Sequence, residues 1–367
     1  MKKILFYLML GVSLVSQSCI NDNEDPVPVV PSEGVSVKPD VRGSAQPNQV
    51  WIDFSDVDQN GQPRQTVNSR TDWDLAFYSG TEFKVVLNTS IMMAAAKIPN
   101  IADIASVKES DVSSLKEVVQ VANFDTENTI YIDDVKGNYP SSQTAIAEID
   151  ADPAKNAVYL VNLGKDIYKG SIAVGSTIAG GDERGWMKIQ VTRQANDYKV
   201  RYGDINAVGS AIKEVIIKKN NAYNFTFFNS KTGKEVAIQP EKDKWDISFS
   251  VFTNIVQGAG SYVNSDFVTI NNVAKVGAYE VKLTSGSAVE VYNKFKKADV
   301  DDSKLVYNEQ RVIGGNWREV GPSGSKVKGD VFYIIKDASG AYFKLRFVQL
   351  TDDKGERGHP MFQYKAL

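Results

Sequence analysis

The sequence predicts an all-β fold made of two tandem antiparallel β domains with minor helical segments. Short runs rich in aromatic and β-branched residues recur along the chain, and several alternate apolar and polar residues as half-buried strands do. Clear examples are WIDF, YNFTFF, KWDISFSVF, VFYIIK and AYFKLRFVQL. Related runs also occur twice in the same order, which indicates an internal duplication.

Length and composition are those of an ordinary globular protein. The 367 residues are enough for two domains with cores of their own, and 42% apolar and 24% charged residues argue against general disorder. The formal net charge of -3 leaves no basic excess to neutralise phosphate groups. A nucleic acid is therefore not an expected partner.

The first residues indicate export. Lys2 and Lys3 precede an apolar run over residues 4–14 that is too short to span a membrane comfortably, so residues 1–18 are predicted to be a signal peptide. Cys19 is the only cysteine and stands where this signal ends. We expect it to be lipidated, which would anchor an outer-membrane lipoprotein by its N-terminus. A free thiol is the alternative.

Residues 19–44 are predicted to be a flexible tether. Acidic residues come first, and four prolines follow at positions 26, 28, 31 and 39. Proline fixes φ and has no N–H to donate, so we expect this segment to stay extended and unpaired. Its acidic start resembles the signal of surface-exposed lipoproteins in some Gram-negative bacteria. A tether within the periplasm is the alternative.

The first part of the duplication is defined by constant spacing. DWDLAF at residues 72–77 returns as KWDISF at residues 244–249, an offset of 172 that also separates Gly61 from Gly233. Tyr223 has the same offset from Trp51. The predicted hairpin turns at Asn60-Gly61 and Thr232-Gly233 suit this assignment, because hairpin turns need residues that tolerate positive φ.

The later strands repeat as well. NAVYLVNL resembles GDVFYIIK, GWMKIQV resembles AYFKLRF, and VRY ending at Tyr202 resembles FQY ending at Tyr364. The predicted domains therefore cover residues 45–207 and 213–367. One amphipathic helix is expected over residues 110–120, with Leu115 and Val119 among its apolar residues.

The repeated Trp-Asp phrase is predicted to be mostly core. In a regular strand Trp73, Leu75 and Phe77 project to one face, where large apolar side chains would pack against a partner sheet. The expected structural anchors are Trp73, Phe77, Trp245 and Phe249. Asp74 and Asp246 are expected to accept backbone hydrogen bonds at a turn.

The second copy resembles the HmuY-like family of bacterial haem-binding lipoproteins. The resemblance rests on TGKEV, KWDISF, VFYIIKDASGAYFKLRFVQL and GHPMFQYKAL in this order, and more weakly on the first copy. It implies a mainly β protein at the cell surface that captures haem or a porphyrin, as a hemophore does. The implied partners are an outer-membrane haem receptor or a host haemoprotein, besides the membrane that holds the lipid.

The resemblance also implies where iron ligands would lie. Family members hold haem iron between two histidines or two methionines, in segments that follow the Trp-Asp strand. This chain has one histidine, His359, so ligation by two histidines of one chain is excluded. The candidate haem-binding residues are Met92 and Met93 in the first copy and Tyr262 in the second. Core filling is the alternative for the methionines, and an exposed aromatic is the alternative for Tyr262.

No other chemistry is predicted. The chain lacks the histidines and cysteines of common catalytic sites and the sequence motifs of nucleotide and metal enzymes, so we expect no enzyme activity. DVDQNG at residues 56–61 begins like a calcium loop, but Val67 stands where such loops carry glutamate. We expect a hairpin turn there and no metal site. The alternative function is a non-haem interaction or adhesion module of the envelope.

Overall fold

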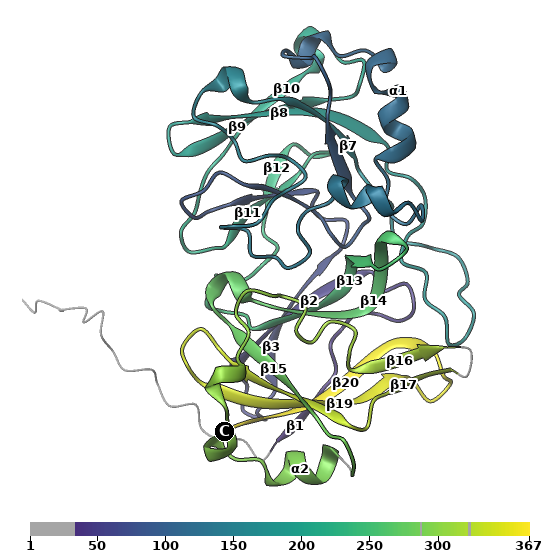
Figure 1. Ribbon diagram of the computed structural model, residues 1–367, viewed down its shortest axis with the longest axis vertical. Coiled ribbons are helices and arrows are strands. Elements are labelled where there is room, and N and C mark those ends of the chain that lie inside the picture. The colour runs from purple at the N-terminus through teal and green to yellow at the C-terminus, as the bar shows by residue number, and fades with distance from the viewer. Residues whose placement is uncertain (1–33, 287, 322–323) are drawn as a thin grey trace, which may run out of the picture.

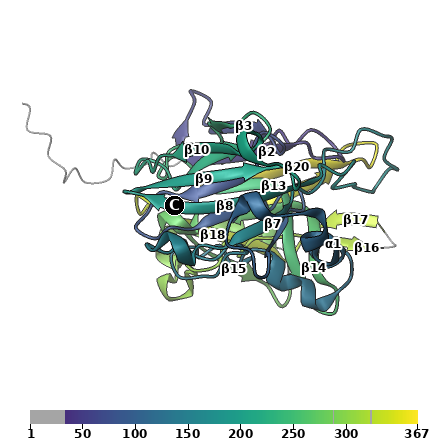
Figure 2. The same ribbon diagram turned by 90° about the horizontal axis from the view of Figure 1, so that it is seen from above.

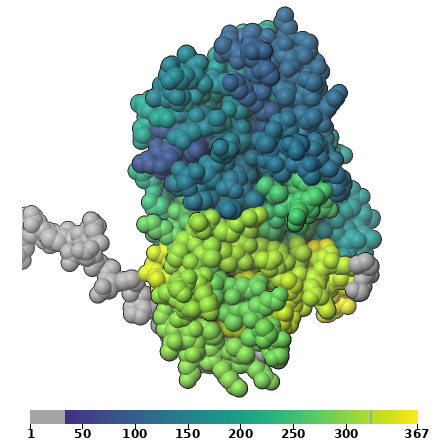
Figure 3. Space-filling view, viewed as in Figure 1, coloured from purple at the N-terminus to yellow at the C-terminus, as the bar shows by residue number. Residues whose placement is uncertain are grey.

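Antiparallel β-sheets make up most of the structure, which confirms the predicted fold class. The computed structural model describes residues 34–286, 288–321 and 324–367. The predicted signal peptide over residues 1–18 and the predicted lipidation site Cys19 lie outside the described residues. Figure 1 shows two units, one above the other, and Figure 3 shows the blue and teal surface of the upper unit meeting the green and yellow surface of the lower one.

The upper unit, here called the inserted unit, is one continuous stretch of chain. Its main elements are β4 (Leu75–Tyr78), β5 (Val85–Leu87), β6 (Ala94–Lys97), α1 (Glu109–Val118), β7 (Val158–Asn162), β8 (Trp186–Gln194), β9 (Asp197–Gly203), β10 (Lys213–Ile217), β11 (Phe225–Asn229) and β12 (Lys234–Val236). They form a five-stranded sheet, β10-β9-β8-β7-β6, and a four-stranded sheet, β12-β11-β4-β5. Figure 2 looks down on the larger sheet, with α1 beside β7.

The lower unit, here called the enclosing unit, combines the start and the end of the described chain. Its main elements are β1 (Val35–Val37), β2 (Asn48–Val57), β3 (Pro63–Ser69), β13 (Ile247–Val256), β14 (Gly260–Ile270), β15 (Gly277–Lys282), α2 (Ala288–Lys294), β16 (Arg318–Gly321), β17 (Gly324–Val327), β18 (Val331–Lys336), β19 (Tyr342–Thr351) and β20 (Arg357–Ala366). Its sheets follow the orders β1-β20-β19-β18-β15 and β14-β13-β2-β3, and β16 pairs with β17.

Short 3-10 helices complete the connections. They are η1 (Ile104–Ser106), η2 (Thr126–Tyr131), η3 (Pro153–Lys155) and η4 (Gly209–Ala211) in the inserted unit, and η5 (Asn272–Ala274), η6 (Lys297–Asp299) and η7 (Asp302–Lys304) in the enclosing unit. The predicted helix over residues 110–120 is present as α1. Val112 and Val119 are buried on its inner side.

The two spatial units differ from the two sequence repeats. Repeats at residues 45–207 and 213–367 suggest that each repeat builds its own sheets, but β2 of the first repeat pairs with β13 of the second, and β11 of the second pairs with β4 of the first. β1 and β10 are exchanged in the same way, beside β20 and β9. The first strands of each repeat therefore complete the sheets of the other.

Each unit has its own apolar core, and this division follows the exchanged strands. The core of the inserted unit is drawn entirely from residues 75–228. The core of the enclosing unit combines residues 37–54 with residues 247–366. The inserted unit thus interrupts the enclosing unit in sequence, and the two connections between them follow β3 and β12.

Strand pairing corrects the alignment of the repeats in two places. Leu75 and Ile247 are equivalent positions of the two repeats. Phe228 lies opposite Leu75 and Ile52 lies opposite Ile247, so Phe228 corresponds to Ile52. The preceding residue, Phe227, therefore corresponds to Trp51, and Tyr223 does not. The predicted hairpin turns are present, with φ of 74° at Gly61 and 69° at Gly233.

The second correction concerns β7 and β18. Ile189 and Leu345 are equivalent positions of the two repeats. Tyr159 lies opposite Ile189 and Tyr333 lies opposite Leu345, so Tyr159 corresponds to Tyr333 rather than to the adjacent Phe332. A shift of one residue matters because it exchanges the two faces of a strand.

The end of the predicted tether is part of the fold, which corrects the expectation for residues 34–44. Val35, Ser36 and Val37 pair with β20, and Val37 and Val41 are buried in the core of the enclosing unit. The prolines did not prevent this pairing because positions 35–37 lie between Pro31 and Pro39 and keep their N–H groups.

Candidate functional site

The four predicted anchors are buried, but the tryptophans do not share a face with the phenylalanines that follow them. Trp73 is 5% exposed and precedes β4, which begins only at Leu75 after a bend at Asp74. Leu75 and Phe77 enter the core of the inserted unit, whereas Trp73 enters an apolar cluster between the two units. The expectation of strict alternation from residue 73 was wrong because the strand starts later.

This cluster between the units, here called the central cluster, repeats one contact twice. Its buried members are Trp51, Trp73, Ala76, Val86, Tyr139, Phe225, Phe227, Ile238 and Trp245. Trp51 meets Trp245 edge to face with ring centroids 4.8 Å apart, and Phe227 meets Trp73 in the same way at 4.8 Å. The equivalent tryptophans of the two repeats therefore lie in equivalent surroundings, each held by a ring from an exchanged strand.

The central cluster surrounds a cavity of about 80 Å³. The indole N–H of Trp73 donates to Gln49 at 2.8 Å, whereas that of Trp245 has no hydrogen-bond partner within the described part of the chain. The strand pairing explains this difference. Phe225 on β11 is the equivalent of Gln49 on β2, and a phenylalanine ring cannot accept the hydrogen bond that the glutamine oxygen accepts. The cavity is well below the roughly 300–1,000 Å³ of small-molecule pockets.

Asp74 and Asp246 accept backbone hydrogen bonds, as expected. Asp74 accepts from the N–H of Ser230 at 2.7 Å, and Asp246 accepts from the N–H of Phe54 at 2.7 Å. Ser230 and Phe54 lie at equivalent points of the exchanged strands. Each aspartate thus fixes the neighbouring strand that the other repeat supplies.

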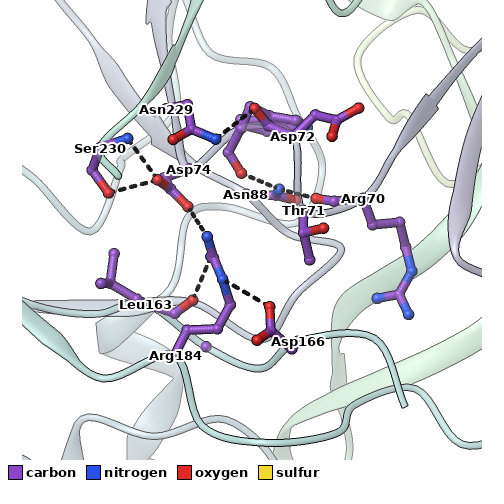
Figure 4. A network of polar contacts seen from close by, with 12 residues as sticks. Arg70, Thr71, Asp72, Asp74, Asn88, Leu163, Asp166, Arg184, Asn229 and Ser230 are labelled. Atoms are coloured by element: carbon purple, nitrogen blue, oxygen red, sulfur yellow. Dashed lines mark hydrogen bonds and ion pairs between the residues drawn. The ribbon is translucent and has the colours of Figure 1, made fainter. Parts of the chain in front are cut away.

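A cation distinguishes the two aspartates. In Figure 4, Arg184 reaches Asp74 at 2.7 Å and also donates to the Leu163 carbonyl oxygen at 2.9 Å. Asp246 has no ion pair with a described residue, and burial raises the pKa of its carboxyl, with Asp53 nearby adding to the effect. Gly340 stands at the position that corresponds to Arg184, so the second repeat cannot supply the same cation.

Arg70, also drawn in Figure 4, connects separate segments without a carboxylate. Its fully buried guanidinium donates to the carbonyl oxygens of Gln46 at 2.6 Å, Ala179 at 3.0 Å and Ala45 at 3.1 Å, and also to that of Ser90. Burial lowers the pKa of Arg70 to about 10, so the side chain remains charged at neutral pH. These contacts mark a structural role.

The structure separates the predicted haem-binding residues. Met93 is 1% exposed in the core of the inserted unit, where it fills space as the alternative interpretation proposed. Met92 is half-buried in a left-handed turn with φ of 64°. Tyr262 is half-buried on β14 of the enclosing unit, beside the exposed ring of Phe124. None of the three lines the central cavity.

The two segments expected to supply ligands are not equivalent. The side-chain amide of Asn88 donates to the Trp73 carbonyl oxygen, and that of Asn271 donates to the Trp245 carbonyl oxygen, each at 2.9 Å. Asn88 and Asn271 are thus equivalent positions. Met92 and Lys275 each lie four residues further along, so Met92 corresponds to Lys275, which has a similar φ of 68°. Tyr262 belongs instead to the outer part of the β13–β14 hairpin, where the inserted unit has only the short connection between β4 and β5.

A hollow of about 450 Å³ lies beside Tyr262. It is lined by Asn254, Asn264, Phe267, Glu309, Arg311, Val312, Gly314, Gly315, Asn316 and Arg318. Tyr262 lies directly opposite Asn254 in the hairpin and two residues before Asn264, so its side chain shares their face of the sheet. The volume falls within the range of ligand pockets.

Cations outnumber anions around this hollow. Arg311 donates two hydrogen bonds to Glu309, at 2.8 and 2.7 Å. Arg318 and Arg357 share the single carboxylate of Asp266, at 3.9 Å from Arg318 and in a closer hydrogen-bonded pair with Arg357. Of the residues that line the hollow, Arg311 and Arg318 carry guanidinium groups and Glu309 carries a carboxylate, so the charge of the lining favours a ligand with negative charge.

Sequence reasoning missed this charged group. Asp266, Arg318 and Arg357 are far apart in the chain and belong to no local motif, so strand pairing alone brings them together. The structure marks Asp266 by its backbone, which has φ of 51° at an irregularity of the β13–β14 pairing. Such strain in a non-glycine residue often accompanies a functional or tightly supported position.

The fold and the hollow define a class of protein: a duplicated antiparallel β protein with strands exchanged between its repeats and a ligand-sized depression on the enclosing unit. The chain belongs to the HmuY family, described as HmuY protein, which matches residues 45–223 and again residues 221–364. This family is associated with haem binding. No curated protein matches the chain. Within the described residues, no helix is long and apolar enough to cross a membrane.

Proposed function

We propose that this protein is a haem- or porphyrin-binding protein rather than an enzyme, and that Tyr262 and the adjacent hollow form the binding site. The match of the HmuY family to both repeats carries the proposal. The hollow beside Tyr262 supports it, because a tyrosine can ligate haem iron and the volume of about 450 Å³ suits a ligand.

The residues around the hollow suit the chemistry of a porphyrin. Phe124 is 69% exposed next to Tyr262 and offers an apolar surface to a flat macrocycle. The guanidinium groups of Arg311 and Arg318 in the lining outnumber the Glu309 carboxylate and favour carboxylate groups such as the propionates of haem. In such a complex the Tyr262 oxygen would be an axial ligand of the haem iron. Met92 is the remaining alternative donor among the predicted ligands, since Met93 is core.

A titration with haemin tests this function. We expect a saturable change in the Soret band for the unaltered protein and at least about tenfold weaker binding for Tyr262→Phe, because the variant keeps the ring and loses the ligand oxygen. Tyr307→Phe is the matched control, since Tyr307 is a 40% exposed tyrosine of the same unit. A spectrum equal to the sum of haemin and protein would overturn the function. Weakening by Met92→Leu alone would overturn only the assignment of Tyr262.

We also propose that the protein is anchored by lipid on Cys19 and exposed at the outer membrane. The sequence before Cys19 and the general occurrence of the family as secreted or surface proteins support this location. Cys19→Ala is expected to move the protein from the membrane fraction to the soluble fraction. Retention of the variant in the membrane fraction would contradict lipidation.

The second candidate function is an envelope interaction or adhesion module, and exposed apolar side chains favour it. Phe124 and Ile130 are 69% and 68% exposed, and Ile255 and Val256 at the tip of the β13–β14 hairpin are 43% and 37% exposed. The segment of Phe124 contacts this hairpin through the ring of Tyr262. Exposed apolar groups often mark interaction surfaces. Absence of haemin binding would favour this function.

A further inference from the structure

The turn between β19 and β20, with the first residues of β20, brings together three potential metal ligands outside the hollow beside Tyr262. Asp352, Glu356 and His359 each offer one ligand atom, and these atoms lie within 4.8 Å of one another. His359 is the only histidine of the chain. Among the described residues, neither carboxylate forms an ion pair within 4.0 Å, so their charge is not neutralised by a lysine or arginine side chain.

The donor set selects a class of ion. One imidazole nitrogen with two carboxylate oxygens suits divalent first-row transition metals such as Zn²⁺, whereas Mg²⁺ and Ca²⁺ take oxygen ligands. Ligand atoms that share a Zn²⁺ ion stand roughly 2.0–2.2 Å from it, so they lie roughly 3–4 Å apart. The three ligand atoms, which lie within 4.8 Å of one another, are close to that separation.

The backbone beneath the cluster is held from several sides. Between Glu356 and His359, the Arg357 guanidinium donates to the buried Asp266 carboxylate at 3.0 Å, and the Arg357 carbonyl oxygen accepts from the Ser44 hydroxyl at 3.0 Å. The Gly358 carbonyl oxygen accepts from the N–H of Gly43 at 3.1 Å. A Cβ at position 358 would lie 1.9 Å from the Gly43 oxygen, so this close approach requires glycine.

Asp352 is fixed in the same turn. One of its oxygens accepts the backbone N–H groups of Glu356 at 2.8 Å and Lys354 at 2.9 Å. Its other oxygen is left for a ligand. Fixed ligands of this kind reduce the ordering cost of metal binding.

We propose that Asp352, Glu356 and His359 bind a divalent first-row transition-metal ion, with water completing its coordination. The site spans the β19–β20 turn and the start of β20, where the backbone is anchored to the enclosing unit, and it requires no haem. Its occupation and the haem function are therefore separate properties of the chain.

The single histidine makes the test direct. Zn²⁺ is titrated into the full chain carrying Cys19→Ser, so that no thiol competes, and the imidazole signals of His359 are followed by NMR. We expect saturable one-to-one shifts with Zn²⁺ and none with equal Mg²⁺. Failure to saturate at millimolar Zn²⁺, or equal shifts with Mg²⁺, would overturn the proposal.

Matched variants separate coordination from general charge attraction. Asp352→Asn keeps an oxygen for the backbone N–H groups of the turn, and Glu356→Gln keeps the shape of the side chain, yet each removes a charged ligand. We expect each variant to weaken Zn²⁺ binding at least about tenfold. Asp353→Asn removes an exposed neighbouring charge and should change binding by less than about twofold. Equal weakening by Asp353→Asn would show non-specific attraction instead of a site.

Discussion

Asp74 and Asp246 occupy equivalent places but face different charges. Both fix an exchanged strand through a backbone N–H at 2.7 Å. Asp74 is fully buried and is neutralised by Arg184, which is 11% exposed in its side chain. Asp246 has no ion pair among the described residues, and its pKa is raised by burial. The cost of burying a carboxylate is therefore met in two ways at the duplicated position: by an ion pair at Asp74 and by a raised pKa at Asp246.

Removing the cation should destabilise the inserted unit. Arg184→Met leaves the Asp74 carboxylate buried without its ion pair, so we expect the free energy of unfolding to fall by about 3–5 kcal/mol. Urea denaturation followed by circular dichroism measures this loss. The double variant Arg184→Met, Asp74→Asn should recover part of it, because the uncompensated charge is gone. A double variant less stable than Arg184→Met alone would contradict the electrostatic explanation.

Asp133 should make stability depend on pH. Its carboxylate oxygens accept the N–H groups of Leu87 at 2.7 Å and Ala145 at 2.9 Å, but burial outweighs these bonds and raises its pKa to about 7. The unfolded chain has a pKa of about 3.9 for aspartate, so between roughly pH 4 and 7 the folded state binds the additional proton. The contribution of Asp133 to the free energy of unfolding therefore falls as pH rises through that window.

The matched variant is Asp133→Asn, which stays neutral at every pH. Stability measured by urea denaturation between pH 5 and 7.5 should decline less steeply with pH in the variant than in the unaltered protein. Asp246 has a raised pKa as well, so some slope should remain. Identical slopes for the two proteins would show that Asp133 does not titrate in this range.

At the level of elements, β1 closes one edge of the enclosing unit. Val37 is fully buried and lies opposite Phe362 on β20, whereas Ser36 is exposed. Val37→Asp should lower the free energy of unfolding by several kcal/mol, because it buries an unpaired charge in the core. Ser36→Asp should change it by less than about 0.5 kcal/mol. Equal thermal stability of the two variants would contradict the packing of β1.

The positions of most strands could be predicted from the sequence, but their partners could not. Alternation and aromatic content indicated β2, β11 and β13, because these patterns depend on which residues a strand buries. The exchange depends on something else. β2 and β11 are copies of one element, and each has the apolar face needed beside β4 or beside β13. Local sequence therefore does not decide which copy each strand joins.

The candidate site was predictable only in part. Tyr262 was identified because a phenol can ligate iron, and it lies beside a hollow. Met93 was indistinguishable from a ligand in sequence, since methionine serves equally as core filling. Asp266, Arg318 and Arg357 meet through long-range pairing, which single-residue chemistry does not indicate. The Trp-Asp phrase correctly predicted buried residues. The bend at Asp74, which directs Trp73 toward the other unit, has no recognisable pattern in the sequence.

At the scale of the molecule, the inserted unit should fold without the rest of the chain. Its core comes entirely from residues 75–228, and its sheets use no strand from outside β4–β12. A fragment of residues 70–241 should give a β-type circular dichroism spectrum and a cooperative thermal transition. Residues 245–367, which lack β1–β3 and hence the partner of β13, should not. A folded second fragment beside an unfolded first one would contradict the division into units.

The pairing of β1 with β20 has a consequence for folding during synthesis, because the two strands are made at very different times. β1 is the first strand of the described residues, yet its hydrogen-bonding partner β20 is the last strand among them. The enclosing unit therefore cannot close during synthesis or during passage through an export channel, since its opening strands wait for its final one. This delay keeps the unit unfolded until its final strand is available, which suits the export that residues 1–18 predict.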